Sequence, residues 1–265
     1  MAKNMSPNAI ANSMESPSSI TVITVTYNCA STLERTLLSV ERQTLRRIQH
    51  LIIDGASKDD TVPIAEAYRM RNPDLDIIVQ SEPDHGLYDA MNKGIRLAEG
   101  DFLVFLNAGD VLHADNVLER VAACDATKVG VVYGETDIVD EHGQFLRHRR
   151  LSTPDVLTSR SFLKGMLVCH QSFYANRGLV QPYDLQYKYS ADFDWCIRVM
   201  EAAEEQGLDM VNLHAVLTDY LSEGMTTQHQ RASLIERLRI MCRRFGWFAA
   251  LRAHIYIIGR AFTLK

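Results

Sequence analysis

The segment ITVITVTYNCASTLERTLLSVERQTLRRIQHLIIDG, residues 20–55, predicts an alternation of strand and helix that the following residues repeat. Its first eight residues are mainly β-branched, which is typical of a strand buried on both faces. A capping-box pattern from Ser31 to Glu34 predicts a helix that continues to about Gln43. Residues 50–53 form a second apolar run, which ends at Asp54. This order predicts a right-handed βαβ unit with parallel strands.

The same alternation continues along the chain. Further strands are predicted by apolar runs at residues 75–80, 101–106 and 129–133. Residues 136–150 are typical of a hairpin, and a helix is expected over residues 191–206. We therefore predict an α/β domain over residues 20–228, with a mostly parallel central sheet flanked by helices.

Composition excludes several classes of protein. The chain has 265 residues, a formal charge of −5 and 46% hydrophobic residues, values of an ordinary globular protein rather than a disordered, collagen-like or polytopic membrane chain. An acidic pI near 6.0 argues against binding to nucleic acid, which needs a basic face. Five separated cysteines without a C-x-x-C pair favour free thiols and a cytoplasmic location. Residues 1–19, rich in Ser, Asn and Pro, are predicted to be a disordered leader without a secretory signal.

Positive charge is concentrated at the C-terminal end. Residues 229–265 hold eight Lys or Arg and one acid, a charge of +7, whereas residues 1–228 carry −12. Two helices are expected, at about 229–245 and 247–262, and arginines alternate with aromatic and aliphatic residues along them. Such a basic amphipathic tail suits the inner face of the cytoplasmic membrane. Equally open is a pair of helices that pack on the sheet and turn their arginines to water.

Polar residues follow four of the predicted strands. They are Asn28, Asp54, residues 82–84 and residues 107–110. Because the carboxyl ends of parallel strands meet at one edge of the sheet, these residues should share a crevice. Acidic oxygens there suit a divalent cation, which in turn can hold a diphosphate. Neither a G-x-G-x-x-G turn, a phosphate-binding P-loop nor a G-x-S-x-G elbow occurs in the sequence.

Four ordered segments resemble motifs of the family-2 glycosyltransferases, which have the GT-A fold. They are ITVTYN at 23–28, IDGASKDDT at 53–61, SEPDHGLYDAMNKGI at 81–95 and FLNAGD at 105–110. The third segment is the most specific, and it resembles the bacterial exopolysaccharide branch that includes colanic-acid-type enzymes. The resemblance extends over about residues 20–225, which is most of the chain.

The resemblance implies a role for each matching residue. Nucleotide and sugar contacts would come from Thr26, Tyr27, Asn28, Asp54, Asp84, Asn92, Lys93 and Asn107. Asp110 would bind Mg²⁺ or Mn²⁺, and Asn107 replaces the first carboxylate of the family's D-x-D-type pattern. Without the resemblance, residues 107–110 are better interpreted as an ordinary turn; Asp54 can also be a turn residue before Gly55, and Lys93 is nearly as well interpreted as a solvated helix residue.

The segment SADFDWCIR at residues 190–198 resembles the part of the family that holds the catalytic base. Asp192 aligns with that base, although an Asp at a helix start is more often an N-cap. Ala191 departs from the usual Glu, which affects contacts with the acceptor. His170, Gln171 and Asp194 are weaker candidates for contacts with the sugar or the acceptor.

The resemblance implies a cytoplasmic, inverting enzyme that transfers a hexose from a nucleotide-diphosphate sugar. Its acceptor would be a saccharide, linked to a polyprenyl lipid, in surface-polysaccharide assembly. One alternative is a sugar-nucleotidyltransferase, which would normally carry a Gly-rich basic loop where residues 27–31 stand. The other is a non-catalytic scaffold of a membrane complex, a reading that Asn107 and Ala191 keep open.

Overall fold

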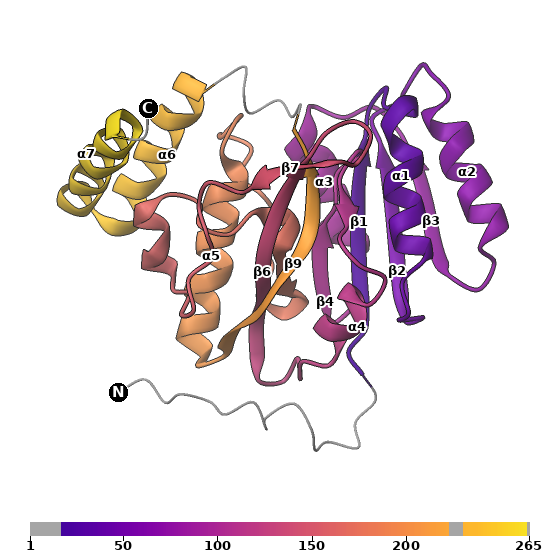
Figure 1. The fold of residues 1–265 in the computed structure, drawn as a ribbon, viewed down its shortest axis with the longest axis horizontal. Helices are drawn as coiled ribbons and strands as arrows, with labels where there is room; N and C mark the ends of the chain where they lie inside the picture. The colour runs from indigo at the N-terminus through magenta and orange to yellow at the C-terminus, as the bar shows by residue number, and fades with distance from the viewer. Residues whose placement is uncertain (1–16, 223–229, 264–265) are drawn as a thin grey trace.

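A nine-stranded sheet forms the centre of the computed structural model, which describes residues 17–222 and 230–263. The strands follow the order β3-β2-β1-β4-β8-β6-β9-β5, and β7 pairs with β6. In Figure 1 helices α1 and α2 lie toward one end of the molecule and α6 and α7 at the other. The predicted α/β class with a central sheet and flanking helices is confirmed.

The first half of the chain is a parallel β/α arrangement. Its strands are β1 (Ile20–Thr26), β2 (Ile48–Asp54), β3 (Asp76–Ser81) and β4 (Phe102–Phe105), and its helices are α1 (Ala30–Glu41), α2 (Thr61–Arg71) and α3 (Leu87–Leu97). Strand β1 is buried along its whole length, as its β-branched sequence predicts. Ile23 and Val25 belong to one apolar cluster with α3, while Ile20 and Val22 belong to another with α1. Helices therefore cover both faces of this part of the sheet.

The second half mixes strand directions. It contributes β5 (Val111–Leu112), β6 (Val129–Val139), β7 (Phe145–His148), β8 (Phe173–Asn176) and β9 (Asp209–Leu221). Strand β9 runs parallel to β6, whereas β5, β7 and β8 are antiparallel to their neighbours. The predicted hairpin is therefore present as β6 and β7. Short helical elements and α5 complete this half: α4 (Val117–Ala122), η2 (Ser159–Lys164), η3 (His170–Ser172), η4 (Arg177–Leu179) and α5 (Ala191–Gln206).

The capping box expected at Ser31 is wrong. The N-cap of helix α1 is Cys29, two residues before Ser31, and no side-chain bond caps the helix. The free backbone amides at this end are instead satisfied by the next βα loop, since Asp59 accepts from the amide of Ala30 at 3.1 Å and Thr61 from that of Cys29 at 2.9 Å.

Helices α6 (Gln230–Phe245) and α7 (Trp247–Thr263) pack on the domain through one face. Ile240, Met241 and Ala250 are fully buried in the same apolar cluster as α5. The backbone amides of Lys188 and Tyr189 donate to the carboxylate of Glu236 on α6, at 2.9 and 2.8 Å. The two C-terminal helices that the sequence predicts are therefore present, and they extend the core.

Two predicted segments fall wholly or partly outside the described residues. Residues 1–16 of the predicted leader lie outside them, as do residues 223–229, where the predicted domain meets the tail. Ser18 and Ser19 are already bonded to the domain: the amide of Ser18 donates to the carbonyl of Ala122 at 3.0 Å and that of Ser19 to Asp101 at 2.7 Å.

Candidate active site

The carboxyl ends of β1, β2 and β3 place Thr26, Asp54 and Ser81 in one row, because these residues pair in the ladders. The Asp54 carboxylate accepts three hydrogen bonds: from Thr26 Oγ1 at 3.0 Å, from Ser81 Oγ at 2.6 Å and from the amide of Ser57 at 2.9 Å. Asp54 is 1% exposed. Burial alone would raise its pKa, but the donors of Ser57 and Ser81 hold the pKa below its ordinary value. An ionised carboxylate therefore ties the three strand ends together.

Tyr27, Asn28 and Asp84 lie beside this row. A Cβ on Gly55 would approach Asp84 Oδ2 to 2.4 Å and the Tyr27 ring to 3.3 Å, so the glycine allows both side chains to cross the strand end. Asn28 has a positive φ of 49° and its side chain accepts from the amide of Lys58 at 2.8 Å. The Tyr27 ring is 65% exposed, so it can stack on a planar ligand.

Lys93 and Asn92, on α3, are both buried and both bonded to the protein. Lys93 Nζ donates to the carbonyl of Pro83 at 2.7 Å and forms an ion pair with Glu82 at 3.0 Å, so it braces the loop that carries Asp84. Asn92 Oδ1 accepts from the amide of Tyr183 at 2.6 Å, and Asn92 Nδ2 donates to the carbonyl of Tyr183 at 3.1 Å. Asn92 thus holds a distant loop, and its amide oxygen and nitrogen are both engaged there.

The turn at residues 107–110 carries a buried carboxylate. Gly109 has a φ of 100°, and a Cβ there would lie 2.7 Å from the Leu221 side chain. Asp110 is 4% exposed and accepts from the amide of Leu221 and from Gln171 Nε2, each at 2.9 Å. Burial outweighs these bonds and raises the pKa of Asp110 to about 6.

Asn107 and Asp110 fit a hard divalent cation. The buried Asn107 Oδ1 has no hydrogen-bond partner, which is unusual for a native structure and leaves an oxygen ligand open. The Asp110 carboxylate offers about four acceptor positions and uses two. Within the described residues, no group of three clustered His, Cys, Asp or Glu ligands includes Asp110. Water and phosphate oxygens would therefore have to complete the coordination shell.

Asp192, in the first turn of α5, is held by two side chains from other elements. Tyr88 Oη donates to Oδ1 at 3.1 Å, and His170 Nδ1 lies 3.4 Å from Oδ2. Burial would raise the pKa of Asp192, but the hydrogen bond and charge of His170, followed by the charge of Arg237, hold it below the ordinary value. Asp192 does not cap its own helix; the N-cap is Ser190, whose side chain makes no capping bond. This carboxylate is ionised and oriented, as a general base must be.

Adjacent residues of η3 connect the two carboxylates. His170 contacts Asp192, and Gln171 donates to Asp110. The backbone of Gln171 is fixed in turn, because Thr218 Oγ1 donates to its carbonyl at 2.7 Å. The buried Nε2 atom of His170 has no partner, so the ring presents a free nitrogen beside the candidate base.

Asp194 faces elsewhere. Its fully buried carboxylate pairs with Arg198 at 2.8 Å and with Arg244 of α6 at 3.0 Å, which fastens α5 to the C-terminal helices. Two residues along a helix point in different directions, so Asp192 and Asp194 cannot serve the same crevice.

Contacts therefore connect Tyr88, Asp192 and Asp110 through η3, and Asp84 lies close to Gly55, directly after β2. Sequence reasoning missed Tyr88 and Arg237 as partners of Asp192. Tyr88 lies inside the SEPDHGLYDAMNKGI segment, which is a signal that could have found it. Arg237 lies over the Phe193 ring, 5.5 Å from its centroid, and no local pattern marks it.

Comparisons with known proteins agree with this architecture. The chain is 33% identical over 210 residues to a PGL/p-HBAD biosynthesis glycosyltransferase of Mycobacterium bovis (strain BCG / Pasteur 1173P2). The matched region covers 77% of each chain. The structure of S. aureus TarS 1–349 with UDP-GlcNAc superposes with a TM-score of 0.68 at 16% identity, over 93% of this chain and 73% of that one. The mannosyltransferase PcManGT from Pyrobaculum calidifontis, solved with GDP-Man and Mn²⁺, gives 0.58 at 18% identity, over 94% and 76%.

The two structural similarities concern the fold alone, because both identities are low. Family membership follows from sequence. The family model described as glycosyl transferase family 2 matches residues 21–180, more than half of the chain, and this range holds every candidate residue except those on α5. The chain belongs to glycosyl transferase family 2.

Proposed function

We propose that this protein is an inverting hexosyltransferase that uses a nucleotide-diphosphate sugar. One observation carries the proposal. The ionised Asp192 is oriented by Tyr88 and His170, and Gln171, the residue after His170, donates to Asp110. A candidate base and a candidate cation ligand are thus connected through η3, and Asp110 follows the carboxyl end of β4, where the ligands of open α/β sheets bind.

In this mechanism Asp192 takes the proton of an acceptor hydroxyl. The hydroxyl oxygen bonds to the anomeric carbon, and the bond from that carbon to the diphosphate oxygen breaks. Its electron pair leaves with the nucleoside diphosphate. Attack from the face opposite the leaving group inverts the anomeric configuration.

The donor would lie along the other side of the crevice. Tyr27 supplies a stacking surface, Asn28 and Asp84 supply polar contacts, and the Thr26–Asp54 pair fixes the strand ends behind them. Asn107 and Asp110 would hold Mg²⁺ or Mn²⁺, which neutralises the charge of the departing diphosphate when bound. The solved PcManGT complex with GDP-Man and Mn²⁺ supports this choice of cofactor class.

The acceptor side is marked by unpaired donors next to Asp192. Arg237 Nε and His170 Nε2 are both buried without a hydrogen-bond partner. A guanidinium suits an anionic group such as a phosphate. This supports a saccharide linked to a lipid phosphate, as used in surface-polysaccharide assembly, as the acceptor.

A panel of sugar nucleotides tests the proposed reaction. With Mn²⁺ present, we expect the purified chain to bind one class of sugar nucleotide and to release its nucleoside diphosphate slowly by hydrolysis. Thermal shift and chromatography of the nucleotide products are the measurements. A non-catalytic scaffold would release none with any donor, and a nucleotidyltransferase would instead release pyrophosphate from a nucleoside triphosphate and a sugar phosphate.

The His170→Ala variant should change the pH dependence of turnover. Loss of the His170 bond leaves the buried Asp192 with fewer groups that stabilise its charge, so its pKa rises. Because the base must be ionised, the acid limb of the kcat profile should move to higher pH than in the wild type. The profile is measured at saturating Mn²⁺ and donor, with the exposed His142→Ala as the control. An unchanged acid limb would contradict the role of His170.

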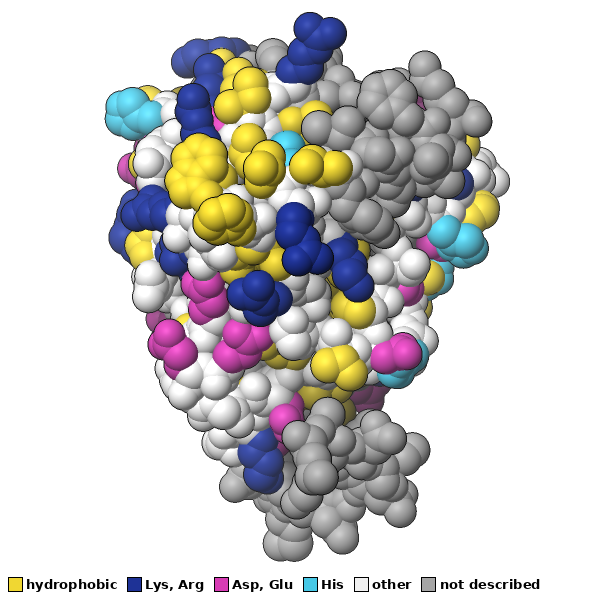
Figure 2. Space-filling view, turned by 90° about the vertical axis from the view of Figure 1, so that its left-hand side faces the viewer, with side chains coloured by type: hydrophobic (Ala, Val, Ile, Leu, Met, Phe, Trp, Pro, Cys, Tyr) yellow, Lys and Arg dark blue, Asp and Glu magenta, His cyan; other side chains and the backbone are white. Residues whose placement is uncertain are grey.

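The outer face of the C-terminal helices supports contact with a membrane surface. Trp247, Phe248, Leu251 and Ile255 are exposed, and Phe248 is 91% exposed. Figure 2 shows hydrophobic side chains gathered on this face, with Lys and Arg side chains among and around them. No helix in the described residues is long and apolar enough to cross a bilayer. We infer peripheral binding to the inner face of the cytoplasmic membrane, driven by apolar insertion and by anionic lipids.

Vesicle sedimentation tests this surface. Deleting the tail would remove Ile240 and Met241 from the core, so substitutions on the outer face are the cleaner test. We expect Trp247→Ser with Phe248→Ser to reduce pelleting with phosphatidylglycerol vesicles at least tenfold. The matched control is Phe145→Ser, which removes an exposed aromatic ring from β7. Equal pelleting of the double variant and the control would refute the assignment.

A further inference from the structure

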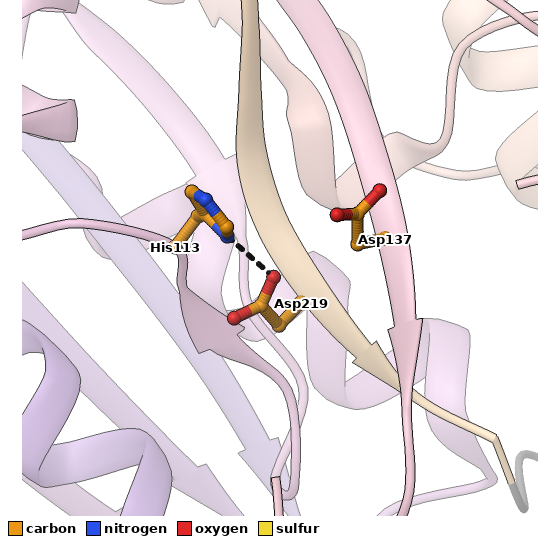
Figure 3. A group of neighbouring side chains, drawn as sticks. All are labelled: His113, Asp137 and Asp219. Atoms are coloured by element: carbon orange, nitrogen blue, oxygen red, sulfur yellow. Dashed lines mark hydrogen bonds and ion pairs between the residues drawn. The ribbon is translucent and has the colours of Figure 1, made fainter. Parts of the chain in front are cut away.

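Two histidines and two aspartates form a row across four neighbouring strands. Val111 pairs with Asp219 where β5 meets β9, Asp219 pairs with Asp137 of β6, and Asp137 pairs with His148 of β7. His113, two residues after Val111, continues the row at its other end. Figure 3 shows His113, Asp219 and Asp137 on three adjacent segments, with the ring of His113 turned toward Asp219.

The four side chains already contact one another in pairs. His113 Nδ1 lies 2.7 Å from Asp219 Oδ1, and His148 Nδ1 lies 2.8 Å from Asp137 Oδ1. His113, Asp137 and Asp219 each offer a ligand atom within 4.8 Å of the others. Zinc bonds of about 2.0–2.2 Å span a group of this size after movements of about 1 Å.

This row lies on the face of the sheet opposite η3. Thr218 and Thr136 each precede an aspartate of the row, and both bond to η3, through the carbonyl of Gln171 and the hydroxyl of Ser172. Successive side chains along a strand point to opposite faces, so Asp219 and Asp137 point away from η3. The row is therefore separate from the site at Asp110 and Asp192.

The two carboxylates need a positive partner. Like charges directly opposite each other on a ladder repel. Among the described residues, neither Asp137 nor Asp219 forms an ion pair with Lys or Arg, and their charged partners are His148 and His113. A divalent cation beside the two carboxylates would supply that charge, and an imidazole nitrogen can bind the same cation.

We propose that His113, Asp137 and Asp219 bind a divalent transition-metal cation, and that the exposed His148 ring, which contacts Asp137, turns to supply a fourth ligand. Two imidazole nitrogens and two carboxylate oxygens match the mixed ligand set and tetrahedral geometry that Zn²⁺ takes. Asp137 is buried, whereas the His148 ring that contacts it is largely exposed.

A bound cation would also brace the strands that hold Asp110. Val111 follows Asp110 directly and pairs with Asp219, and two residues after Asp219 the amide of Leu221 donates to the Asp110 carboxylate. The proposal does not depend on the transfer reaction, because it concerns the other face of the sheet.

Metal binding to the full-length protein tests the proposal. Metal-free protein is titrated with Zn²⁺ in equilibrium dialysis and with Co²⁺ in visible absorption, where tetrahedral Co²⁺ gives intense bands. We expect one site of micromolar or tighter affinity in the wild type and in Asp110→Asn. Affinity should fall at least tenfold in Asp219→Asn and in His113→Ala. His142→Ala, which removes a histidine paired with Glu141 on an exposed turn, should bind like the wild type.

Three results would overturn the site: no stoichiometric Zn²⁺ binding, equal affinity in Asp219→Asn, or loss in Asp110→Asn with retention in Asp219→Asn. Circular dichroism and the midpoint of thermal unfolding show whether each variant is folded. His148→Ala provides a second variant that should fold, because its ring is largely exposed, and it should bind Zn²⁺ more weakly and without the tetrahedral Co²⁺ spectrum.

Discussion

The Asp192→Asn variant should lose at least about 1000-fold in kcat while it binds the donor within a few-fold of the wild type. Asn keeps the volume of Asp192 and can still accept from Tyr88 Oη, so the crevice keeps its shape. What disappears is the capacity to take a proton. Turnover is measured with donor and acceptor at saturation, and donor affinity by calorimetry in the presence of Mn²⁺.

Asp194→Asn is the matched control, since Asp194 is a buried aspartate on the same helix two residues later. It should lower the thermal midpoint, because it leaves Arg198 and Arg244 without their buried partner, a change that costs about 3–5 kcal/mol in comparable ion pairs. Its kcat below the unfolding transition should stay within a few-fold of the wild type. Wild-type turnover in Asp192→Asn, or an equal loss in both variants, would remove Asp192 as the base.

The fold was predictable because its determinants are local. The β-branched run at residues 20–26 is a buried strand, and the switch between strand and helix periodicity places the elements of the parallel half. The helix start at α1 was not predictable in the same way. Its backbone donors are satisfied by Asp59 and Thr61, about thirty residues away, while the local pattern pointed to Ser31.

The candidate site shows the same difference between what a local pattern predicts and what contacts between distant residues decide. The end of a predicted strand and the motif together nominated Asp110, the motif alone nominated Asp192, and the structure gives both a connected environment. Motif position also nominated Asn92, but its amide bonds to the backbone of Tyr183, a contact between residues 91 positions apart. A local pattern cannot separate a side chain that faces a ligand from one that holds a distant loop.

Contacts from the C-terminal helices were the least predictable part. Arg237 influences Asp192 from α6, outside the matched family region, and Arg244 pairs with the buried Asp194. The charge pattern of the tail left two interpretations equally open, contact with an anionic surface or helices that pack on the sheet. In the structure some arginines fix α6 to the domain, while apolar side chains on the outer face remain exposed.

Asp110→Asn should weaken Mn²⁺-dependent binding of the sugar nucleotide at least about 100-fold. Asn107 and Asp110 are the oxygen ligands that the turn offers, and Asp110 alone carries a charge, so its loss leaves two neutral amides. Binding is measured by calorimetry with and without Mn²⁺. Asp115→Asn removes an exposed acid five positions later that pairs with Arg42 at 3.6 Å, and it should leave the Mn²⁺ response unchanged.

The same carboxylate predicts how the metal response depends on pH. Burial raises the pKa of Asp110 to about 6, so a proton competes with the cation below that pH. In the wild type the Mn²⁺-dependent gain in donor affinity should be constant at pH 7–8 and should fall by up to tenfold for each pH unit below about 6. The Asp110→Asn variant should show no such fall, because it has no proton to exchange. A wild-type response that is flat from pH 5 to 8, or an Asp110→Asn response that equals it, would place the cation on other ligands.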